Sequence, residues 1–186
     1  SRCSGASRVD PGAPQWSMVD RRTCAGGRLL PENQVLNYLE LIDHRIPSAG
    51  DLYDELPLWS AAFGRMLLKQ VPLRSGMTIL DVGAGTGWLT IELAQRCGPE
   101  SIVIAVDPWE AAMQRLARKI DYLGLRNVRT LVQDAESIDL PGSSVHMIVS
   151  NLGINNFGNC EAVLQTCFRA AKPGADLYLT TNLVGH

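Results

Sequence analysis

Apolar and polar residues follow two distinct patterns along the second half of the chain. Short runs that are apolar almost throughout predict five strands: MTILDV, SIVIAVD, NVRTLVQD, VHMIVSN and ADLYLTTN. Between them, apolar residues recur at helical spacing, most clearly in the stripe Trp109, Met113, Leu116, Ile120 and Leu123. Apolar strands that alternate with helices predict an α/β fold with a doubly wound, mostly parallel sheet and helices on both faces.

The last helix and strand of this pattern are separated by a turn signal. The helix predicted in CEAVLQTCFRAA should end at Lys172-Pro173-Gly174, because proline cannot continue a helix and glycine favours its end. The fifth strand is therefore expected to begin at Ala175.

The first part of the chain is organised differently. Residues 1–30 are rich in Gly, Pro, Ser and Arg without periodicity, which predicts a flexible leader. Residues 31–72 contain helical segments, with a break expected at Pro57, and we expect them to form a helical lid. Residues 73–186 carry the alternating pattern and form the predicted core domain.

Composition narrows the classes of function. The formal net charge of −2 provides no basic surface, so no nucleic-acid partner is expected. No apolar run approaches the roughly 20 residues that span a bilayer, and no signal peptide is evident, so we expect no membrane partner and a cytoplasmic location. The cysteines form no C-x-x-C pair and have no histidine at metal-ligand spacing, so no metal site is predicted. Cys97 and Cys167 are expected to be small core residues.

The candidate chemistry lies in ILDVGAGTGWLT, where a glycine loop (Gly83–Gly87) directly follows the first predicted strand. Glycine is needed in such a loop because a Cβ would block a tight turn or the approach of a ligand to the backbone. The helix that follows offers N–H groups to an anion. In sheets of this kind, ligands bind beyond the carboxyl ends of the strands, where the strand order reverses.

Three ligand chemistries compete for a loop of this kind. A nucleoside triphosphate loop requires a lysine after its last glycine, and none follows Gly87. A dinucleotide fold requires G-x-G-x-x-G, but its third glycine position is occupied by Trp88. The spacing is instead G-x-G-x-G, preceded by Asp81, which leaves another adenosine-bearing cofactor.

LDVGAGTG resembles motif I of the class I S-adenosylmethionine-dependent methyltransferases. The resemblance continues in register through Asp107, QDAESIDLP and SNLGINNF, each at the end of a predicted strand. FRAAKPGADLYLT is similar to the helix, turn and fifth strand of the small-molecule, "type 11" and quinone-biosynthesis-like branch. The resemblance covers about residues 74–183. It implies a Rossmann-like fold, S-adenosylmethionine as cofactor, and in-line methyl transfer to a small organic acceptor.

The resemblance also implies roles for the motif residues. Asp81 and the glycine-loop backbone would hold the methionine portion of the cofactor, Asp107 would accept from the ribose hydroxyls, and Asp134 would accept from the adenine amino group. Adjacent residues would pack on the adenine or close the amino-acid end. The implied cofactor set is Asp81, Gly83, Ala84, Gly85, Thr86, Gly87, Asp107, Pro108, Trp109, Asp134, Ala135, Asn151 and Leu152.

Some of these residues have a purely structural alternative. Asp107 could cap the helix that starts near Trp109, Asp134 could be an ordinary turn residue, and Trp109 could be mostly core. The pair Gly83 and Gly85 has no comparable alternative, so we expect both to serve the ligand.

The catalytic candidates are fewer. Alignment of donor and acceptor can contribute about 7–11 kcal/mol, and a base is needed only where the acceptor loses a proton. Tyr53, as a lid over the cofactor, is the first candidate, with Asp54 and Trp59 beside it. Asn155 and Asn156 follow the fourth strand and are also candidates, although they could simply shape a turn.

Two further expectations concern the fifth strand and the class of protein. The resemblance implies two more strands, whereas the chain ends at His186, so the sheet is expected to look truncated after its fifth strand. That strand would be an exposed edge through which a homo-oligomer could form. The alternatives to a methyltransferase are a non-catalytic cofactor- or partner-binding module of the same fold and, less favoured, an NAD-dependent dehydrogenase.

Overall fold

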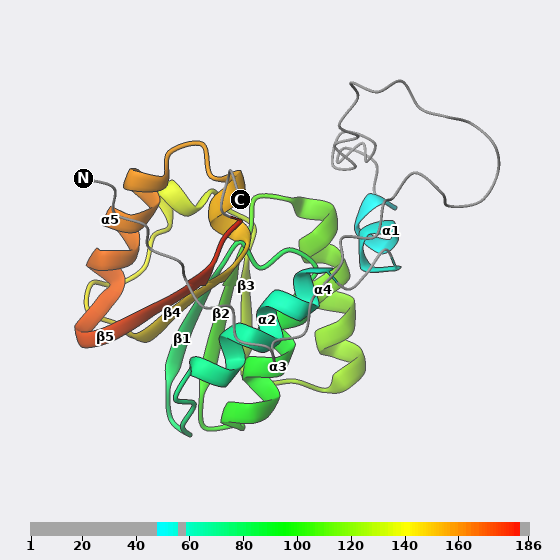
Figure 1. Cartoon of the computed structure of the whole chain (residues 1–186). Coiled ribbons are helices and arrows are strands. Elements are labelled where there is room, and N and C mark those ends of the chain that lie inside the picture. The colour runs from blue at the N-terminus through cyan, green and yellow to red at the C-terminus, as the bar shows by residue number, and fades with distance from the viewer. Residues whose placement is uncertain (1–47, 56–58, 183–186) are drawn as a thin grey trace, which may run out of the picture. The chain divides into compact units, whose positions relative to one another are not determined.

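The computed structural model describes residues 48–55 and 59–182 (Figure 1). The predicted leader, residues 1–30, and the first part of the predicted lid lie outside these residues. The elements in chain order are α1 (Ala49–Glu55), α2 (Trp59–Gln70), β1 (Thr78–Val82), α3 (Trp88–Cys97), β2 (Ile102–Val106), α4 (Glu110–Leu123), β3 (Val128–Leu131), η3 (Ala135–Ser137), β4 (Val145–Asn151), η4 (Gly153–Asn156), α5 (Cys160–Ala170) and β5 (Ala171–Thr180).

The strands form one parallel sheet in the order β3-β2-β1-β4-β5. The chain adds β2 and β3 on one side of β1, then crosses over and adds β4 and β5 on the other. The strand order therefore reverses between β1 and β4, as the predicted doubly wound α/β fold requires. The glycine loop after β1 and η4 after β4 both lie at this switch point, which is where such sheets bind ligands.

Helices cover both faces of the sheet, which confirms the predicted layering. Successive strand residues point to opposite faces. Ile79 packs with Leu93 on the face of α2 and α3, and Leu80 packs with Cys167 on the face of α5. Helix α4 adds Met113 over β2. Figure 1 shows α2, α3 and α4 on one side of the sheet and α5 on the other.

The predicted helix stop at Lys172-Pro173-Gly174 is confirmed, since α5 ends at Ala170 and residues 172–175 fall between the pairs Ala171–Val145 and Asp176–Met147, but the predicted start of the strand at Ala175 is not. Strand β5 begins at Ala171, directly after α5, and its register against β4 shifts between Val145 and Met147. The backbone carbonyls of Arg169 and Ala170 accept from the N–H groups of the loop before β4, and Ala171 pairs with Val145, so β5 starts before the unpaired residues 172–175. A bulge of this kind accommodates both the missing N–H of proline and the positive φ of Gly174.

Other details of the core agree with the pattern, with one exception. Cys97 and Cys167 are buried, as predicted for small core residues. Met113 and Leu116 of the α4 stripe are also buried, but Leu123 is 43% exposed. It lies in the last turn, just before Gly124 ends the helix, and so extends past the region that the sheet covers. In the described ranges, no helix is long and apolar enough to cross a membrane.

Candidate functional site

Asp107 joins the end of β2 to the glycine loop. Its Oδ2 accepts from the Gly85 N–H at 2.8 Å, and its Oδ1 accepts from the Trp109 N–H at 2.8 Å. Burial raises the pKa of Asp107, and the two N–H bonds partly offset that rise. The bond to Trp109 lies in the turn before α4, whose N-cap is Trp109 and which receives no side-chain cap, so Asp107 does not cap the helix. Each carboxylate oxygen can accept a further hydrogen bond, which suits a pair of vicinal hydroxyls.

The glycine loop owes its shape to three residues with positive φ. The φ angles are 76° at Gly83, 53° at Gly85 and 84° at Gly87. A Cβ on Gly87 would lie 2.1 Å from Leu116 Cδ1, whereas a Cβ on Gly85 would meet no protein atom within 4 Å. Gly85 is thus the position where the loop presents bare backbone to open space, which fits a loop that cradles a ligand.

Gly83 was expected to serve the ligand, but it is also required for backbone packing. A Cβ on Gly83 would lie 2.8 Å from the Cα of Gly153, and a Cβ on Gly153 would lie 2.7 Å from the Val82 carbonyl oxygen. The loops after β1 and β4 therefore touch backbone to backbone at the switch point. Gly153 and the buried Ser150, whose hydroxyl donates to Val82 O at 2.8 Å, were missed by sequence reasoning. Their location in SNLGINNF, directly after β4, was the available signal.

Several N–H groups of the loop are already bonded within the protein. The N–H groups of Gly83 and Ala84 both donate to Val106 O, at 2.9 and 3.0 Å, and that of Gly87 donates to Ala84 O at 2.9 Å. Together with the bond from Gly85 to Asp107, these contacts hold the loop rigidly against the end of β2. The loop is therefore a preformed wall for a ligand, rather than an open anion hole of the kind expected at a helix start.

Asp81 lies at the carboxyl end of β1 and is 1% exposed. Its Oδ2 accepts from the equally buried Thr90 hydroxyl at 2.6 Å. Burial raises its pKa to about 7; the Thr90 bond opposes the rise, and the charge of Asp107 adds to it. Because Asp81 is almost fully buried, it could contact a ligand directly only if the surrounding loop opened. Its role in holding the methionine portion of the cofactor, which the resemblance implies, therefore stays a prediction.

Trp88 is accommodated by a glycine that sequence reasoning missed. Its indole packs against the core on the face of α2 and α3. A Cβ on Gly64 of α2 would lie 2.3 Å from Trp88 Cζ3. The helix covering this end of α3 therefore comes close only because residue 64 has no side chain. This arrangement differs from a dinucleotide fold, where the residue at position 88 would itself be the glycine.

The predicted lid residues lie next to Asp107. The rings of Tyr53 in α1 and Trp109 at the start of α4 make an edge contact, with centroids 5.4 Å apart and planes at 86°. Pro108, between Asp107 and Trp109, is exposed. Burial alone would raise the pKa of Asp54, but its bonds to Lys119 and Arg115 hold that pKa below the ordinary value. It is therefore a poor candidate for a base.

The predicted adenine residues lie at the start of η3. Asp134 is exposed, and its Oδ1 accepts from the Glu136 N–H at 2.9 Å, so it caps η3 as an ordinary turn residue would. Ala135 is 3% exposed and packs in the core beside α5. Neither contact bears on an adenine, and their predicted role in the cofactor site stays a prediction.

The residues after β4 connect the switch point to neighbouring elements. The Asn151 side chain donates to Ser60 O of α2 at 2.9 Å and accepts from the Thr180 hydroxyl at 2.7 Å. Leu152 has a φ of 63°, which starts the tight η4 turn. The catalytic candidates Asn155 and Asn156 are exposed within η4, and Asn155 accepts from Thr181 at 2.6 Å. Asn155 and Asn156 therefore lie in a turn, and their catalytic role stays a prediction.

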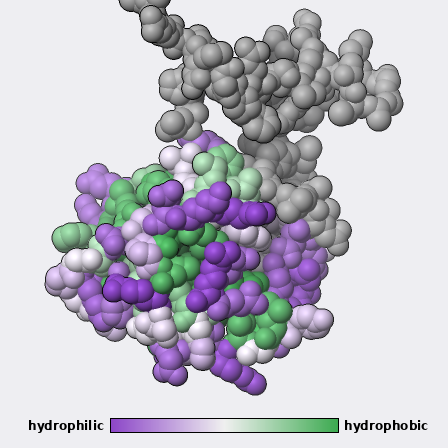
Figure 2. Space-filling model, turned by 60° about the horizontal axis from the view of Figure 1, so that its bottom comes forward, coloured by the Kyte–Doolittle hydropathy of each residue, from purple (hydrophilic) through white to green (hydrophobic). Residues whose placement is uncertain are grey.

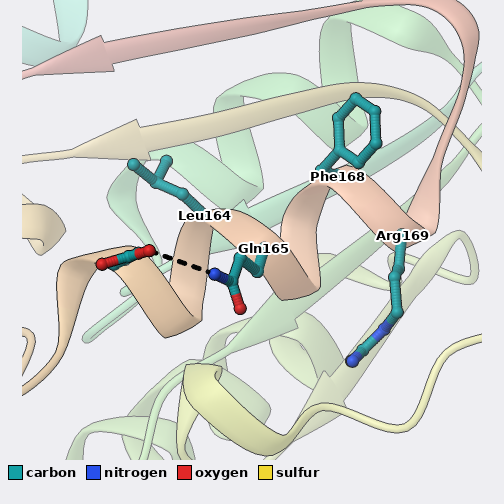
Figure 3. Close-up of a pocket in the computed structure, with 5 residues that line it drawn as sticks. Leu164, Gln165, Phe168 and Arg169 are labelled. Carbon is teal, nitrogen blue, oxygen red and sulfur yellow. Dashed lines mark hydrogen bonds between the residues drawn. The ribbon is translucent and has the colours of Figure 1, made fainter.

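A separate hollow lies along α5 (Figure 3). It has a volume of about 670 Å³ and is lined by Glu161, Leu164, Gln165, Phe168 and Arg169. Leu164 and Phe168 extend from one side of the helix, and Gln165 and Arg169 from the other. None of the predicted cofactor residues lines it. Within residues 48–55 and 59–182, no cluster of three or more His, Cys, Asp or Glu side chains could hold a metal ion.

Comparison with known proteins identifies the class. The methyltransferase domain family matches residues 79–174, which is more than half of the chain and spans the strand-end motifs described above. The chain belongs to this family, and the predicted resemblance to class I S-adenosylmethionine-dependent methyltransferases of the quinone-biosynthesis-like branch is confirmed.

Individual relatives are similar over most of the chain. A ubiquinone/menaquinone biosynthesis C-methyltransferase, UbiE, from Coxiella burnetii is 29% identical over 163 residues, which cover 84% of this chain and 64% of that protein. The crystal structure of a SAM-dependent methyltransferase from Aquifex aeolicus is 30% identical, with a TM-score of 0.63, over 72% of this chain and 71% of that one. The chain thus spans about two thirds of the length of these relatives.

The fold alone is shared more widely than the family name suggests. The crystal structure of the cyclase SpnF has a TM-score of 0.59 at 19% identity, and covers 75% of this chain and 48% of that one. Function resides in sites rather than in folds, so the function of this chain has to be inferred from the residues around Asp107 and the glycine loop.

Proposed function

We propose that this chain is the cofactor-binding core of an S-adenosylmethionine-dependent methyltransferase that acts on a small organic acceptor. The observation that carries the proposal is the arrangement of Asp107 and Gly85. A half-buried carboxylate is held against a loop whose middle glycine faces open space, at the switch point of a parallel sheet. Membership of the methyltransferase domain family supports it.

The residues present suit the adenosine portion of such a cofactor. Asp107 would accept from the ribose hydroxyls with the lone pairs that Gly85 and Trp109 leave free. Trp109 and Tyr53 would flank the base, and Gly85 would let the methionine portion lie against the loop. When bound, S-adenosylmethionine supplies an electrophilic methyl group on a sulfonium. The protein's contribution is then to hold this donor in line with an acceptor.

The relatives suggest the first acceptors to test. The relatives named C-methyltransferases belong to ubiquinone and menaquinone biosynthesis, which points to a carbon atom of a quinone precursor as the acceptor. Tyr53, whose ring contacts Trp109, is the first candidate for a group that touches the acceptor or closes the site, and Asn155 and Asn156 are the others. We place the protein in the cytoplasm as part of the same proposal.

Calorimetry tests the proposal directly. The chain should bind the two sulfur ligands, S-adenosylmethionine and S-adenosylhomocysteine, and should not bind NAD. The variant Asp107→Ala should bind neither sulfur ligand. Circular dichroism of the variant checks that the fold is intact. Binding of NAD in place of the sulfur ligands would favour the dehydrogenase alternative. Binding without methyl transfer to any quinone precursor would favour the non-catalytic module.

Strand β5 could also pair with a second copy of the chain. It lies at one end of the strand order, and Leu177 and Leu179 on it are 43% and 38% exposed. Figure 2 shows that hydrophobic side chains reach one face of the molecule in separate groups between hydrophilic ones. Sedimentation analysis should then give a dimer that Leu177→Lys converts to a monomer.

A further inference from the structure

We propose that Thr180, at the end of β5, is a positioning residue that fixes the wall of the site on the β4 side. It thereby sets the affinity for the amino-acid portion of the cofactor, and not for the adenosine portion. The inference rests on the proposed function and deepens it. It assigns a role in binding to a hydroxyl group that is not among the predicted site residues.

The Thr180 hydroxyl connects β5 to the two residues at which β4 ends and η4 begins. It donates to Asn151 Oδ1 at 2.7 Å and accepts from the Leu152 N–H at 3.1 Å. The same N–H also donates to the carbonyl oxygen of Thr180 at 3.1 Å, so Leu152 keeps a partner when the hydroxyl is removed. The bond to Asn151 is partly buried and depends on the hydroxyl alone. A partly buried oxygen that loses its donor costs free energy, because water replaces that donor incompletely.

Asn151 extends the contact from β5 to α2. Its Nδ2 donates to the carbonyl oxygen of Ser60, at the start of α2, at 2.9 Å. A Cβ on Gly64, one turn further along α2, would lie 3.2 Å from this nitrogen, so the helix comes close because residue 64 has no side chain. The two polar atoms of the Asn151 amide thus bond to two different elements, and the amide holds the start of α2 and the end of β5 together.

Leu152 extends the contact from β5 to the glycine loop. Its φ of 63° is unfavourable for a residue with a side chain, and such a conformation persists only where the surrounding contacts fix it. Gly153 follows directly, and a Cβ on Gly83 would lie 2.8 Å from the Gly153 Cα. Since the two backbones touch there, a shift of Leu152 would also move the start of the glycine loop.

The place of these contacts in the sheet decides which part of the cofactor they affect. Asp107 follows β2, and β4 lies on the other side of β1. The proposed position of the base, between Trp109 and Tyr53, is on the Asp107 side. A cofactor whose ribose is held by Asp107 therefore extends its amino-acid portion across β1 towards β4. The wall that Thr180 fixes is the one that this portion meets.

Thr181 provides a matched control at the next position. Its hydroxyl donates to Asn155 Oδ1 at 2.6 Å, so it also links the end of β5 to η4. That contact is exposed and reaches the later part of η4. A comparison of the two threonines thus separates a general link between β5 and η4 from the link to the residues at which β4 ends.

The experiment compares two probes by calorimetry: S-adenosylhomocysteine, and methylthioadenosine, which has the adenosine portion without the amino-acid group. In Thr180→Val, Kd should rise about fivefold for the first probe and change by less than about twofold for the second. Thr180→Ser, which keeps the hydroxyl, and Thr181→Val should both bind as the wild type does. Thr180→Val combined with Asn151→Ala should bind no more weakly than Asn151→Ala alone.

Three results would overturn the inference. The first is an equal rise in Kd for both probes in Thr180→Val, which would indicate a general loss of structure. The second is the same rise in Thr181→Val, and the third is a comparable rise in Thr180→Ser.

A measurement without ligand separates this inference from the proposed function. Hydrogen exchange at the amides of Leu152 and Asn155 should be faster in Thr180→Val, since the Asn155 N–H donates to the Leu152 carbonyl. Exchange at Gly85 should not change, and Thr181→Val should leave the Leu152 amide as it is in the wild type. If the wild-type chain binds neither probe, the proposed function fails, and the exchange result alone decides whether Thr180 holds η4. Unchanged exchange at Leu152 in Thr180→Val would refute that role.

Discussion

Asp81 is a buried acid at the end of β1, and its substitution offers a quantitative test of the structure. The residue is 1% exposed, and burial raises its pKa to about 7, with Thr90 opposing the rise and Asp107 adding to it. In the unfolded chain, its pKa returns to the ordinary value of 3.8. The folded chain therefore holds this proton more tightly than the unfolded chain does. As a result, ionised Asp81 destabilises the fold.

The magnitude follows from the two pKa values. Each unit of pKa difference corresponds to about 1.4 kcal/mol, so ionised Asp81 costs about 4 kcal/mol of unfolding free energy above pH 7. The cost declines as the pH falls from 7 towards 4, and it vanishes below the unfolded pKa, where both states are protonated. Asp81→Asn keeps the size of the side chain and can still accept from Thr90, but carries no charge. It should therefore stabilise the chain by up to about 4 kcal/mol at pH 8 and by much less at pH 4.

Urea denaturation followed by circular dichroism, at intervals between pH 4 and pH 8, measures this difference. Subtracting the wild-type curve from the variant curve removes the contribution of titrating groups that do not interact with Asp81. Asp139→Asn, at an exposed position, controls for effects of the substitution that do not depend on pH. A free-energy difference between Asp81→Asn and wild type that stays constant across this range would refute the reasoning. So would a variant that is less stable at pH 8 than at pH 4 relative to wild type.

Four further substitutions test the site and the core. Gly85 and Gly124 both have positive φ, and a Cβ at either position would meet no other atom within 4 Å. Gly85→Ala and Gly124→Ala should therefore lower the free energy of unfolding in urea equally, by about 1–2 kcal/mol. Only Gly85→Ala should abolish S-adenosylhomocysteine binding in calorimetry. Gly87→Ala adds a Cβ 2.1 Å from Leu116 Cδ1 and should cost about 2–4 kcal/mol in urea denaturation; a loss below 1 kcal/mol would contradict this contact. Asn127→Ala removes the donor to two buried carbonyls and should cost about 1–3 kcal/mol, with the ligand Kd unchanged.

The sequence alone predicted the parallel sheet and the position of its ligand edge. It did so because apolar strands alternating with helices have few packing solutions, and because parallel strands direct their carboxyl ends to the same edge. Asp107 and the glycine loop were therefore predicted to be neighbours, and Asp107 Oδ2 accepts from Gly85 N–H. The helix stop before Lys172-Pro173-Gly174 was predicted correctly, but the pairing of Ala171 with Val145 was not, because local turn signals cannot reveal a pair that forms only when β5 meets β4.

The tertiary structure decided which residues complete the site. Gly83 meets Gly153 and Trp88 meets Gly64 only because the fold brings distant segments into contact. Asp54 lies outside every motif, yet it forms ion pairs with Arg115 and Lys119 of α4, which are more than 60 positions away in the sequence. Such contacts depend on how helices pack over the sheet, which short-range periodicity does not encode. Periodicity and strand-end motifs thus determined the fold class and the cofactor edge, whereas packing between distant segments decided how that edge is shaped and held closed.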